Sequence, residues 1–424
     1  MSPTDSAPAV APFRGLTCRG LYDAIFEADA PEQVVRQLPA QSLFMIVKDR
    51  GMESSADLIA MASLEQCRVL TDFDLWHNDS LNEENLWRWL AITDETDSLE
   101  LLQKLVKFID LKLIAILIAR YVDARVFDEP TEQSPGPEFH TPDKGHTWIG
   151  IKTENPDHHF LLARLLALIF ESSAELFYQL LATPSVATMT MLEEEAFSER
   201  MKRLAAEGVP EPEVAAAVHL PLSTAEALRE VQESSKHIVI EDVRAVEPLV
   251  YEARSRRLFA TLLSEVSDHE MLEMEFTYIM NAAVMRWGVD FSDQTKVLEL
   301  AEQVKGTINI ALEKLLKDGK TTTIAAYSAL GLGKLYRLGL TELMALRSKA
   351  RKVPLEALEK AKDENQAAFS AVACAREAFP VMPLFLNDDG SIVDEGGSLP
   401  SGTKPIGSLQ AVATVSALLD SAAK

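Results

Sequence analysis

The chain has 424 residues, of which 47% are hydrophobic and 25% are charged, and its formal net charge at pH 7 is -24. These fractions are typical of folded globular proteins and exclude a fibrous or wholly disordered chain, and the length allows roughly two or three domains. The negative charge disfavours binding to nucleic acids and anionic membranes, which depends on clustered Lys and Arg. We therefore expect a folded protein with no nucleic acid among its partners.

The N-terminal stretch "MSPTDSAPAVAPF" has neither the basic nor the apolar region of a secretory signal, so residues 1–17 are expected to form a disordered tail. The three cysteines, Cys18, Cys67 and Cys374, are far apart and form no CxxC motif, which indicates neither a disulfide framework nor a zinc ribbon. We expect a cytoplasmic protein without a bound metal or cofactor.

No membrane span is expected. The most apolar runs are "LKLIAILIARYV" and "FLLARLLALIF", and both are shorter than the roughly 20 residues that cross a bilayer. Arg120 and Arg164 also interrupt them. These runs are interpreted as core helices.

An array of short helices is predicted over residues 18–130. "LPAQSLFMIVKDRG" is typical of a helix that ends at Gly51, "MESSADLIAMA" of a second helix, and "SLEQCRVL" of a third that opens with a Ser63/Gln66 capping box. "PEQVVRQL" at Pro31 is echoed loosely by "LEQCRVL" at Leu64, which allows a superhelix of paired helices.

Trp76, Trp87 and Trp89 are three of the five tryptophans and fall within one short span of the chain. They could line an aromatic binding site or fill gaps between helices. Because they fall at a junction between two predicted helices, we interpret them as core residues.

A β-hairpin is predicted to connect two helical blocks over residues 131–152. Extended runs around Phe139 and from Thr147 to Ile151 flank the turn sequence "PDKG". The predicted fold is therefore mainly α: an N-terminal array of helices, a small β-hairpin and a second helical region.

That helical domain is predicted over residues 153–380. In it, a stripe of apolar residues from Val297 to Leu315 follows helical spacing, and Ser292 could cap that helix. In "TIAAYSALGLGKLYRLGLTELMALRSKA", the small residues Ala325, Ala329 and Gly333 are expected to allow close packing of a neighbouring helix. Residues 381–424 are rich in Gly, Pro and Asp and are expected to be irregular before a short helix from about Ser408.

Several of these segments together resemble a family of bacterial proteins described only by a domain of unknown function. The segments are "LPAQSLFMIVKDRGMESSADLIAMASLEQ", "DFDLW", "FHTPDKGHTWIGI", "EEEAFSERMKRLAAEGVPEPEVAAAV", "EMEFTYIMNAAVM" and "LGKLYRLGLTELMALRSKA". The resemblance implies a helical fold and no known activity, so it transfers no catalytic residue. The N-terminal block also resembles the acidic helical cytosolic domain of magnesium transporters, but no membrane domain follows it, so transport is not implied.

Two clusters invite comparison with metal sites. Asp157, His158 and His159 resemble a triplet of manganese phosphoesterases, but the further Asp motifs of that class are not found, and Asp157 is better interpreted as a helix N-cap. His269 and Glu273 share a helix face beside Glu270. Di-iron bundles use Glu-x-x-His on two helices, whereas here the order is reversed and has no second copy. A solvated acidic face is expected.

Two loop motifs are incomplete. "NDDGSIVDEG" places Asn387 and Asp389 like a calcium loop, but Phe385 and Gly396 stand where the first ligand and the bidentate carboxylate belong, so a turn is expected. "GLGK" at Gly331 fails as a phosphate loop, because Ser328 replaces its first glycine and Leu335 the hydroxyl residue after Lys334.

A helix-turn-helix pattern covers residues 213–231, with a helix from Glu213 to Val218, a turn from His219 to Leu222 and a second helix from Ser223. The second helix carries Glu226, Glu230 and Glu233 against Arg229 alone, which would oppose DNA phosphates.

The leading hypothesis is a cytoplasmic interaction or regulatory scaffold, because the chain is acidic, rich in short amphipathic helices and lacks a complete catalytic motif. Its partner would be a protein, and a basic one if charge holds it. Two alternatives remain: an enzyme with a cryptic, metal-dependent site at His158/His159 or His269/Glu273, and a DNA-binding protein that uses residues 213–231.

Overall fold

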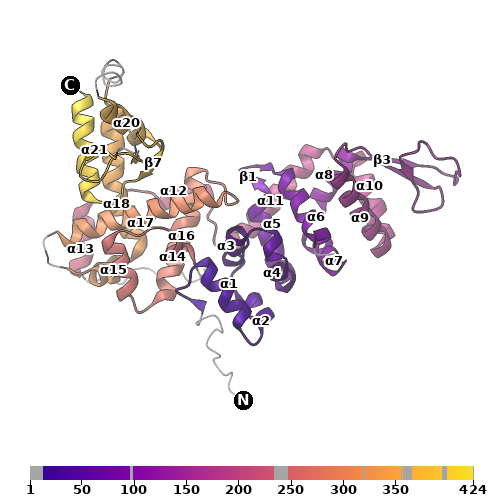
Figure 1. Ribbon diagram of the computed structural model, residues 1–424, viewed down its shortest axis with the longest axis horizontal. Coiled ribbons are helices and arrows are strands. Elements are labelled where there is room, and N and C mark those ends of the chain that lie inside the picture. The colour runs from indigo at the N-terminus through magenta and orange to yellow at the C-terminus, as the bar shows by residue number, and fades with distance from the viewer. Residues whose placement is uncertain are drawn as a thin grey trace. The chain divides into compact units, whose positions relative to one another are not determined.

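The protein is mainly helical, as predicted, and its strands pair in small antiparallel sheets (Figure 1). The computed structural model describes residues 13–95, 99–233, 247–317, 319, 321–354, 356, 365–393 and 399–423. The chain divides into two compact units. Unit 1 comprises the residues up to Leu21 together with Gly208–Lys424, and unit 2 comprises Tyr22–Glu207. Unit 2 is thus inserted in the sequence of unit 1.

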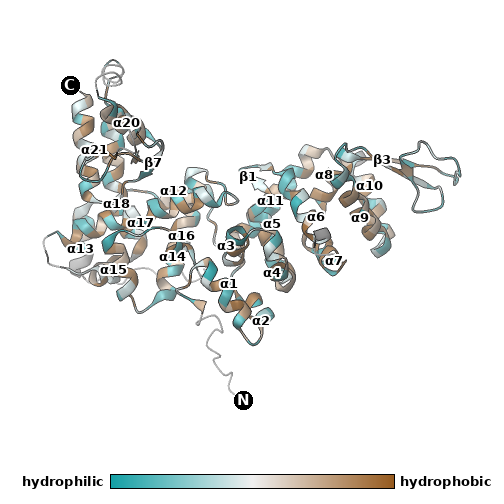
Figure 2. Cartoon of the chain, viewed as in Figure 1, coloured by the Kyte–Doolittle hydropathy of each residue, from teal (hydrophilic) through white to brown (hydrophobic). Residues whose placement is uncertain are grey.

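The helices of unit 2 are from 3 to 18 residues long. They are η2 (Glu53–Ser55), α2 (Pro31–Gln37), α3 (Ala40–Arg50), α4 (Ala56–Met61), α5 (Leu64–Asp74), α6 (Glu83–Glu95), α7 (Leu99–Phe108), α8 (Leu111–Tyr121), α9 (Pro156–Ser172), α10 (Ala174–Val186) and α11 (Met189–Ala206), and α1 (Cys18–Glu27) leads into them. Most of these helices have one hydrophobic and one hydrophilic face (Figure 2). The hydrophobic faces meet in the core, as amphipathic periodicity requires.

Local signals set the ends of several helices. Gly51 follows α3 with φ 87°, a left-handed conformation that only glycine adopts at low cost. The predicted capping box opens α5: the Ser63 hydroxyl accepts a hydrogen bond from the Gln66 backbone, and the Gln66 side chain accepts one from the Ser63 N–H. The three short helices expected in this region are therefore confirmed.

Two small sheets belong to unit 2. The predicted hairpin forms from β4 (Phe139–His140) and β5 (Thr147–Ile151), with Phe139 opposite Gly150. A third strand, β3 (Val122–Val126), pairs antiparallel with the other side of β5, and the sequence did not predict it. β1 (Trp76–His77) and β2 (Ser80–Leu81) make the second sheet.

The helices of unit 1 are from 4 to 29 residues long. They are α12 (Pro212–Val218), α13 (Thr224–Glu233), α14 (Leu249–Glu252), α15 (Arg257–Glu265), α16 (His269–Trp287), α17 (Gln294–Leu316), α18 (Thr323–Arg351), α20 (Gln366–Arg376) and α21 (Leu409–Ala422). β6 (Val381–Pro383) pairs with β7 (Thr403–Pro405), and Ser408 caps α21. The C-terminal helix therefore begins at the predicted position, with Ser408 as its N-cap.

α17 and α18 pack closely at the centre of unit 1. A Cβ at Gly339 of α18 would overlap the carbonyl oxygen of Thr307 in α17, so only glycine permits this approach. The predicted apolar stripe of α17 is buried from Val297 to Leu315. Its N-cap is Asp293 rather than the predicted Ser292, because the Asp293 carboxylate accepts a hydrogen bond from the Lys296 N–H.

The first described residues pack into unit 1. Phe13 is buried, the Gly15 N–H donates to the Glu273 carboxylate at 3.1 Å, and Arg14 pairs with Glu270 at 2.8 Å. The disordered tail was expected to extend to residue 17. Residues 1–12 lie outside the described part of the chain, and Phe13, Arg14 and Gly15 have the contacts just given.

Candidate functional site

The three tryptophans predicted as core are buried in unit 2, with 2%, 4% and 1% of Trp76, Trp87 and Trp89 exposed. The Trp89 indole N–H donates to Asp74 Oδ2 at 2.9 Å, and the Trp87 indole N–H donates to Glu83 at 3.2 Å. The indole N–H groups of Trp87 and Trp89 therefore have hydrogen-bond partners inside the unit, as buried indoles require. The core interpretation is confirmed.

The Asp157, His158 and His159 triplet lies at the start of α9. Asp157 does not cap this helix as predicted: the N-cap is Asn155, whose side chain accepts hydrogen bonds from the backbone of residues 157 and 158, and α9 begins one residue later at Pro156. The His158 ring stacks on Trp87 with 4.2 Å between ring centroids. His158 and His159 thus lie on the helical surface beside the core.

The prediction of a solvated acidic face at His269 and Glu273 is wrong for Glu273, which is fully buried. The Tyr251 hydroxyl donates to Glu273 Oε1 at 2.9 Å and lies 3.2 Å from His269 Nδ1. Burial raises the pKa of the Glu273 carboxyl, against hydrogen bonds from Gly15 and Tyr251 that stabilise its charge. These partners come from distant segments, so local sequence could not reveal them.

A second buried carboxyl, Glu247, extends this network. It accepts hydrogen bonds from the Thr277 hydroxyl at 3.2 Å and from the Leu249 N–H at 3.1 Å. Burial raises the pKa of Glu247 to about 7, and the nearby Glu273 adds to the rise. Lys305 is fully buried and donates to the Ala253 carbonyl at 2.5 Å, and burial lowers its pKa to about 7. None of the pockets described below opens onto this network.

The calcium-like motif forms the predicted turn. The Asn387 N–H donates to the Ser391 carbonyl at 2.8 Å, and Gly390 has φ 89°. Asp388 is paired with Arg256 at 3.2 Å and accepts a hydrogen bond from Ser408 at 2.6 Å. Gly396, the expected twelfth position, lies outside the described residues. The Asp388 carboxylate therefore links this turn to Arg256 and Ser408.

The helix pair at residues 213–231 is present as α12 and α13; each begins within one residue of its predicted start, and α13 continues to Glu233. His219, between the two helices, has φ -96°. Its Nδ1 lies 2.7 Å from the Ala215 carbonyl, and its ring contacts Trp287 and Tyr336 edge to face. Burial lowers the pKa of His219. The turn is thus anchored in unit 1.

The "GLGK" stretch marks a break that the sequence did not predict. Gly331 has φ 66° and ψ 170°, which interrupts α18, so that a second helical segment starts at Leu332. Glu275 of α16 is 6% exposed, and its Oε2 accepts a hydrogen bond from the Leu332 N–H at 2.8 Å. The carboxylate thus caps the new helix N-terminus, where the backbone dipoles favour a negative charge.

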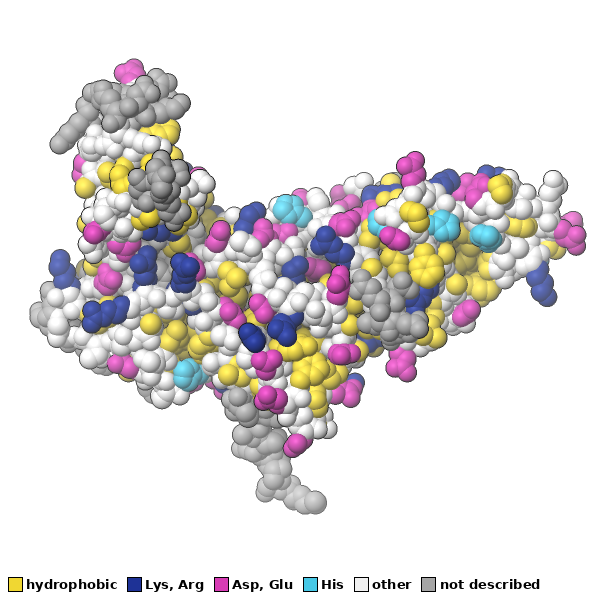
Figure 3. Space-filling view, in the orientation of Figure 1, with side chains coloured by type: hydrophobic (Ala, Val, Ile, Leu, Met, Phe, Trp, Pro, Cys, Tyr) yellow, Lys and Arg dark blue, Asp and Glu magenta, His cyan; other side chains and the backbone are white. Residues whose placement is uncertain are grey.

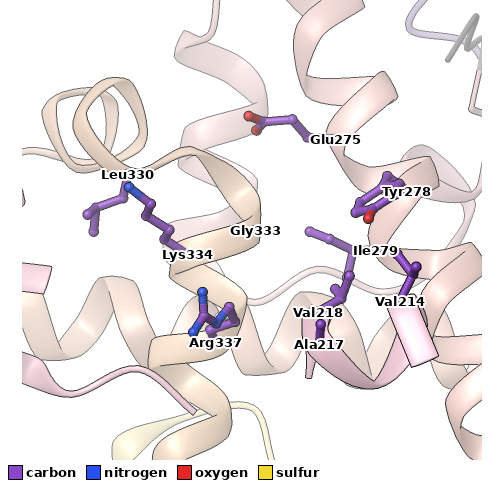
Figure 4. Close-up of a pocket in the computed structure, with 10 residues that line it drawn as sticks. All are labelled: Val214, Ala217, Val218, Glu275, Tyr278, Ile279, Leu330, Gly333, Lys334 and Arg337. Atoms are coloured by element: carbon purple, nitrogen blue, oxygen red, sulfur yellow. The ribbon is translucent and has the colours of Figure 1, made fainter. Parts of the chain in front are cut away.

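A pocket of about 300 Å³ opens beside this break (Figure 4). Its walls come from three helices: Val214, Ala217 and Val218 of α12, Glu275, Tyr278 and Ile279 of α16, and Leu330, Gly333, Lys334 and Arg337 of α18. The volume lies at the lower end of the range for small-molecule sites. This mixture of apolar walls with a few polar groups makes it the candidate site.

Positive charge dominates the polar part of the pocket. Lys334 and Arg337 are three residues apart on α18, so they share one helix face. Arg337 donates through Nε to the Leu220 carbonyl at 2.6 Å, and no carboxylate among the described residues forms an ion pair with it. Burial raises the pKa of the Tyr278 hydroxyl, which stays protonated and can donate a hydrogen bond.

Gly333 leaves room in the pocket wall. A Cβ at this position would meet no atom within 4 Å. The predicted close helix packing along Ala325, Ala329 and Gly333 is therefore wrong at Gly333, and Ala325 is exposed. The close approach on α18 occurs instead at Gly339. Glycine at position 333 keeps space open where any side chain would project into the pocket.

The sequence missed Glu275, Tyr278 and Arg337 as site residues. The spacing of Lys334 and Arg337 could have indicated a basic helix face, but their meeting with α16 depends on the tertiary fold. Among the described residues, no three His, Cys, Asp or Glu side chains converge as a metal site would need. No helix in the described part of the chain is long and apolar enough to cross a membrane.

Comparison with known proteins gives one match. No curated protein and no solved structure matches the chain, so the likeness to magnesium transporters is not shown. The family model of a family of unknown function, DUF6178, matches residues 12–373. The sequence therefore belongs to the uncharacterised family that its helical segments indicated, and the chain is a member of DUF6178.

Proposed function

We propose that the protein is a cytoplasmic regulatory scaffold, and that unit 1 binds a small ligand with an anionic group on an apolar body. The observation that carries the ligand proposal is the pocket between α12, α16 and α18, whose lining combines Lys334 and Arg337 with apolar side chains. A guanidinium binds a carboxylate or phosphate through paired hydrogen bonds. The cytoplasmic location is supported by the cysteines, since no disulfide joins any two of the three, all of which are described.

The carboxylate of Glu275 does not prevent the pocket from binding an anion. Glu275 is committed to the Leu332 N–H and is also close to the Tyr327 hydroxyl, whose pKa is raised first by burial and then by the Glu275 charge. Its carboxylate is therefore held by α18, and Arg337, whose Nε donates to the Leu220 carbonyl, is the cation that the pocket offers to an anion. The remaining walls, such as Val214 and Ile279, favour an apolar body.

The volume limits the ligand. At about 300 Å³, the pocket holds a molecule of roughly ten to fifteen non-hydrogen atoms, given that a water occupies about 30 Å³. We infer a small organic acid or phosphate ester. Because it contacts α12, α16 and α18 at once, its binding would fix α12 against α18 and so could regulate the surface that these helices present.

The test is a ligand screen on the purified full-length protein. Matched sets of small apolar carboxylates, phosphate esters and their neutral amides or alcohols are compared by thermal shift and then by titration calorimetry. We expect saturable binding of at least one anion and at least tenfold weaker binding of its neutral analogue. The carboxylate and phosphate sets distinguish the two anions. Absence of saturable binding throughout both sets would overturn the proposal.

Variants locate the site. Gly333→Leu fills the pocket, and leucine has a higher helix propensity than glycine, so the fold should tolerate it. Arg337→Met removes one charge, and Arg351→Met is the matched control, since Arg351 is exposed on the same helix outside the pocket. We expect Gly333→Leu and Arg337→Met to weaken binding at least tenfold and Arg351→Met to leave it unchanged. Wild-type affinity in Gly333→Leu would place the ligand elsewhere.

A further inference from the structure

Unit 2 has a separate groove with a volume of about 480 Å³. It lies between the β4–β5 hairpin and α9, and the start of α10 closes one end. Its lining is Glu138, His140, Thr141, Pro142, Ile149, Ile151, His159, Ala163, Leu166, Ala167, Phe170, Glu171 and Phe177. The groove therefore brings together the predicted hairpin and the His159 region. Neither of these belongs to the proposed ligand site in unit 1.

The interior of this groove is apolar and firmly supported. Leu166 and Phe177 are buried at 4% and 1% exposure, and Phe170 packs edge to face on Phe177. The hairpin is held in place because Asp143 accepts hydrogen bonds from the Thr147 N–H and from the Tyr178 hydroxyl, each at 2.7 Å. A rigid apolar groove can receive a side chain at low entropic cost.

The groove also has small residues at its mouth. Ala163 and Ala167 are one turn apart on α9 and leave space there. Phe160 lies three residues before Ala163 and is 52% exposed, so it extends the apolar surface along the same helix. Figure 3 shows hydrophobic side chains gathering over part of unit 2, whereas acidic side chains are spread across this face of the molecule. An exposed apolar surface of this kind marks a contact site.

Charge decides which partner fits. Glu138 and Glu171 are exposed carboxylates in the lining, which contains neither Lys nor Arg. The whole chain carries -24, so a second copy or an anionic lipid surface is repelled at long range. A segment with positive charge beside an apolar side chain fits both the apolar interior of the groove and the carboxylates of Glu138 and Glu171.

We propose that this groove binds a short segment of a partner protein in which an aromatic or large aliphatic side chain stands next to Lys or Arg. The apolar side chain enters between Leu166 and Phe177, and the cation pairs with Glu138 or Glu171 at the rim. Such an interface gains most of its affinity from the buried anchor and its selectivity from the charges. This proposal is independent of the ligand site in unit 1.

The first experiment is a selection of random twelve-residue peptides displayed on phage against the full-length protein. We expect enrichment of peptides that combine an aromatic or aliphatic residue with adjacent Lys or Arg. Selected peptides are then synthesised with a fluorophore and measured by fluorescence polarisation, together with versions in which Lys and Arg become Glu or the anchor becomes Ser. Both changes should weaken binding at least tenfold. No enrichment, or enrichment of acidic peptides, would overturn the proposal.

Variants of the protein test the position. Ala167→Trp fills the mouth of the groove from an exposed helix position, so it should abolish peptide binding without unfolding the unit. Glu138→Lys/Glu171→Lys should reverse the preference toward Glu-flanked peptides, whereas Glu194→Lys, at an exposed position of α11 outside the groove, should not. Equal binding by wild type and Ala167→Trp contradicts the assignment. Light scattering identifies self-association, and a dimer lost in Ala167→Trp would show that a second copy occupies the groove, against the proposal.

Discussion

Glu275 and Leu332 are joined by a 2.8 Å hydrogen bond from the Leu332 N–H to the buried Glu275 carboxylate. The bond stands where Gly331 interrupts α18, so a residue of one helix caps the restart of another. It also holds the edge of the candidate ligand pocket, which both residues' helices line. This hydrogen bond therefore supports both the second segment of α18 and the wall of the proposed ligand pocket.

Loss of this cap should destabilise unit 1. In Glu275→Ala, the Leu332 N–H would lose a charge-assisted hydrogen bond inside the protein, at a cost of about 2 to 3 kcal/mol. The free energy of unfolding, measured in urea, checks this. Glu299→Ala on the exposed face of α17 is the control and should change it by less than about 0.5 kcal/mol. Equal stability of the two variants would show that Glu275 is not a cap in solution.

The tryptophan core of unit 2 gives a second prediction. Trp87 is 4% exposed and packs on His158 and Tyr121, so Trp87→Ala would leave a large cavity. The expected loss is about 3 to 5 kcal/mol of unfolding free energy, measured by chemical denaturation. Unchanged stability together with the loss of a bound ligand would favour the aromatic binding site that the sequence left as an alternative.

The third prediction concerns pH. Burial raises the pKa of Glu247 to about 7, so between its ordinary value of 4.5 and about 7 the folded protein holds a proton that the unfolded chain has lost. Stability contributed by protonated Glu247 should therefore fall as pH rises through this window, by at most about 1.4 kcal/mol per pH unit. Glu247→Gln should flatten this part of the profile, measured by urea unfolding at pH 5, 6 and 7.

The exposed Glu299→Gln variant serves as the control for that profile. Lys305 should affect the pH dependence of stability in the opposite direction, because its pKa is lowered to about 7. Its contribution to the free energy of unfolding should rise from about pH 7 toward 10.5, and this rise should persist in Glu247→Gln. A wild-type slope between pH 5 and 7 in Glu247→Gln would mean that another group, such as Glu273, carries the effect.

The enzyme alternative is addressed by metal analysis. We predict that protein purified without added metal contains no stoichiometric zinc, iron or manganese by elemental mass spectrometry. One equivalent per chain that disappears in His158→Ala/His159→Ala would instead support a metal-dependent activity at the start of α9. Because the His158 ring stacks on the buried Trp87, the free energy of unfolding of the paired variant is measured alongside its metal content.

For nucleic acid, we predict no measurable affinity for duplex DNA at physiological ionic strength. The net charge is -24, and the described part of α13 exposes Glu226 beside Arg229. Few clustered cations are then available to displace counterions from phosphates. A gel shift or polarisation assay over a salt series checks this, and salt-sensitive binding that Arg229→Glu abolishes would restore the helix-turn-helix hypothesis.

Local signals predicted much of the fold and little of the site. Gly51, Ser63 and Ser408 mark helix ends through their own backbone and hydroxyl chemistry, so the sequence was sufficient there. Where two capping residues stand close together, as at Ser292 and Asp293, local sequence did not distinguish them. β3 was missed because it becomes a strand only by pairing with β5, far along the chain.

The environments of the candidate site residues depend even more on partners that are distant in sequence. A solvated Glu273 was predicted because it shares a helix face with His269 beside Glu270, whereas its carboxylate in fact bonds Tyr251 and Gly15. The break at Gly331 becomes favourable once Glu275 arrives from α16 to satisfy the N–H that the break exposes. In both cases the decisive group is supplied by tertiary packing.

The contact between Gly15 and Glu273 joins residues 258 positions apart, and all of unit 2 is encoded between them. During synthesis at about 5 to 20 residues per second, the N-terminal segment must wait roughly 13 to 50 s for its partner to emerge from the ribosome. Unit 2 can complete its core in that interval. Assembly in the cell should therefore follow the order of translation, with unit 2 folded first and unit 1 completed last around the segment at Gly15, which precedes unit 2 in the chain.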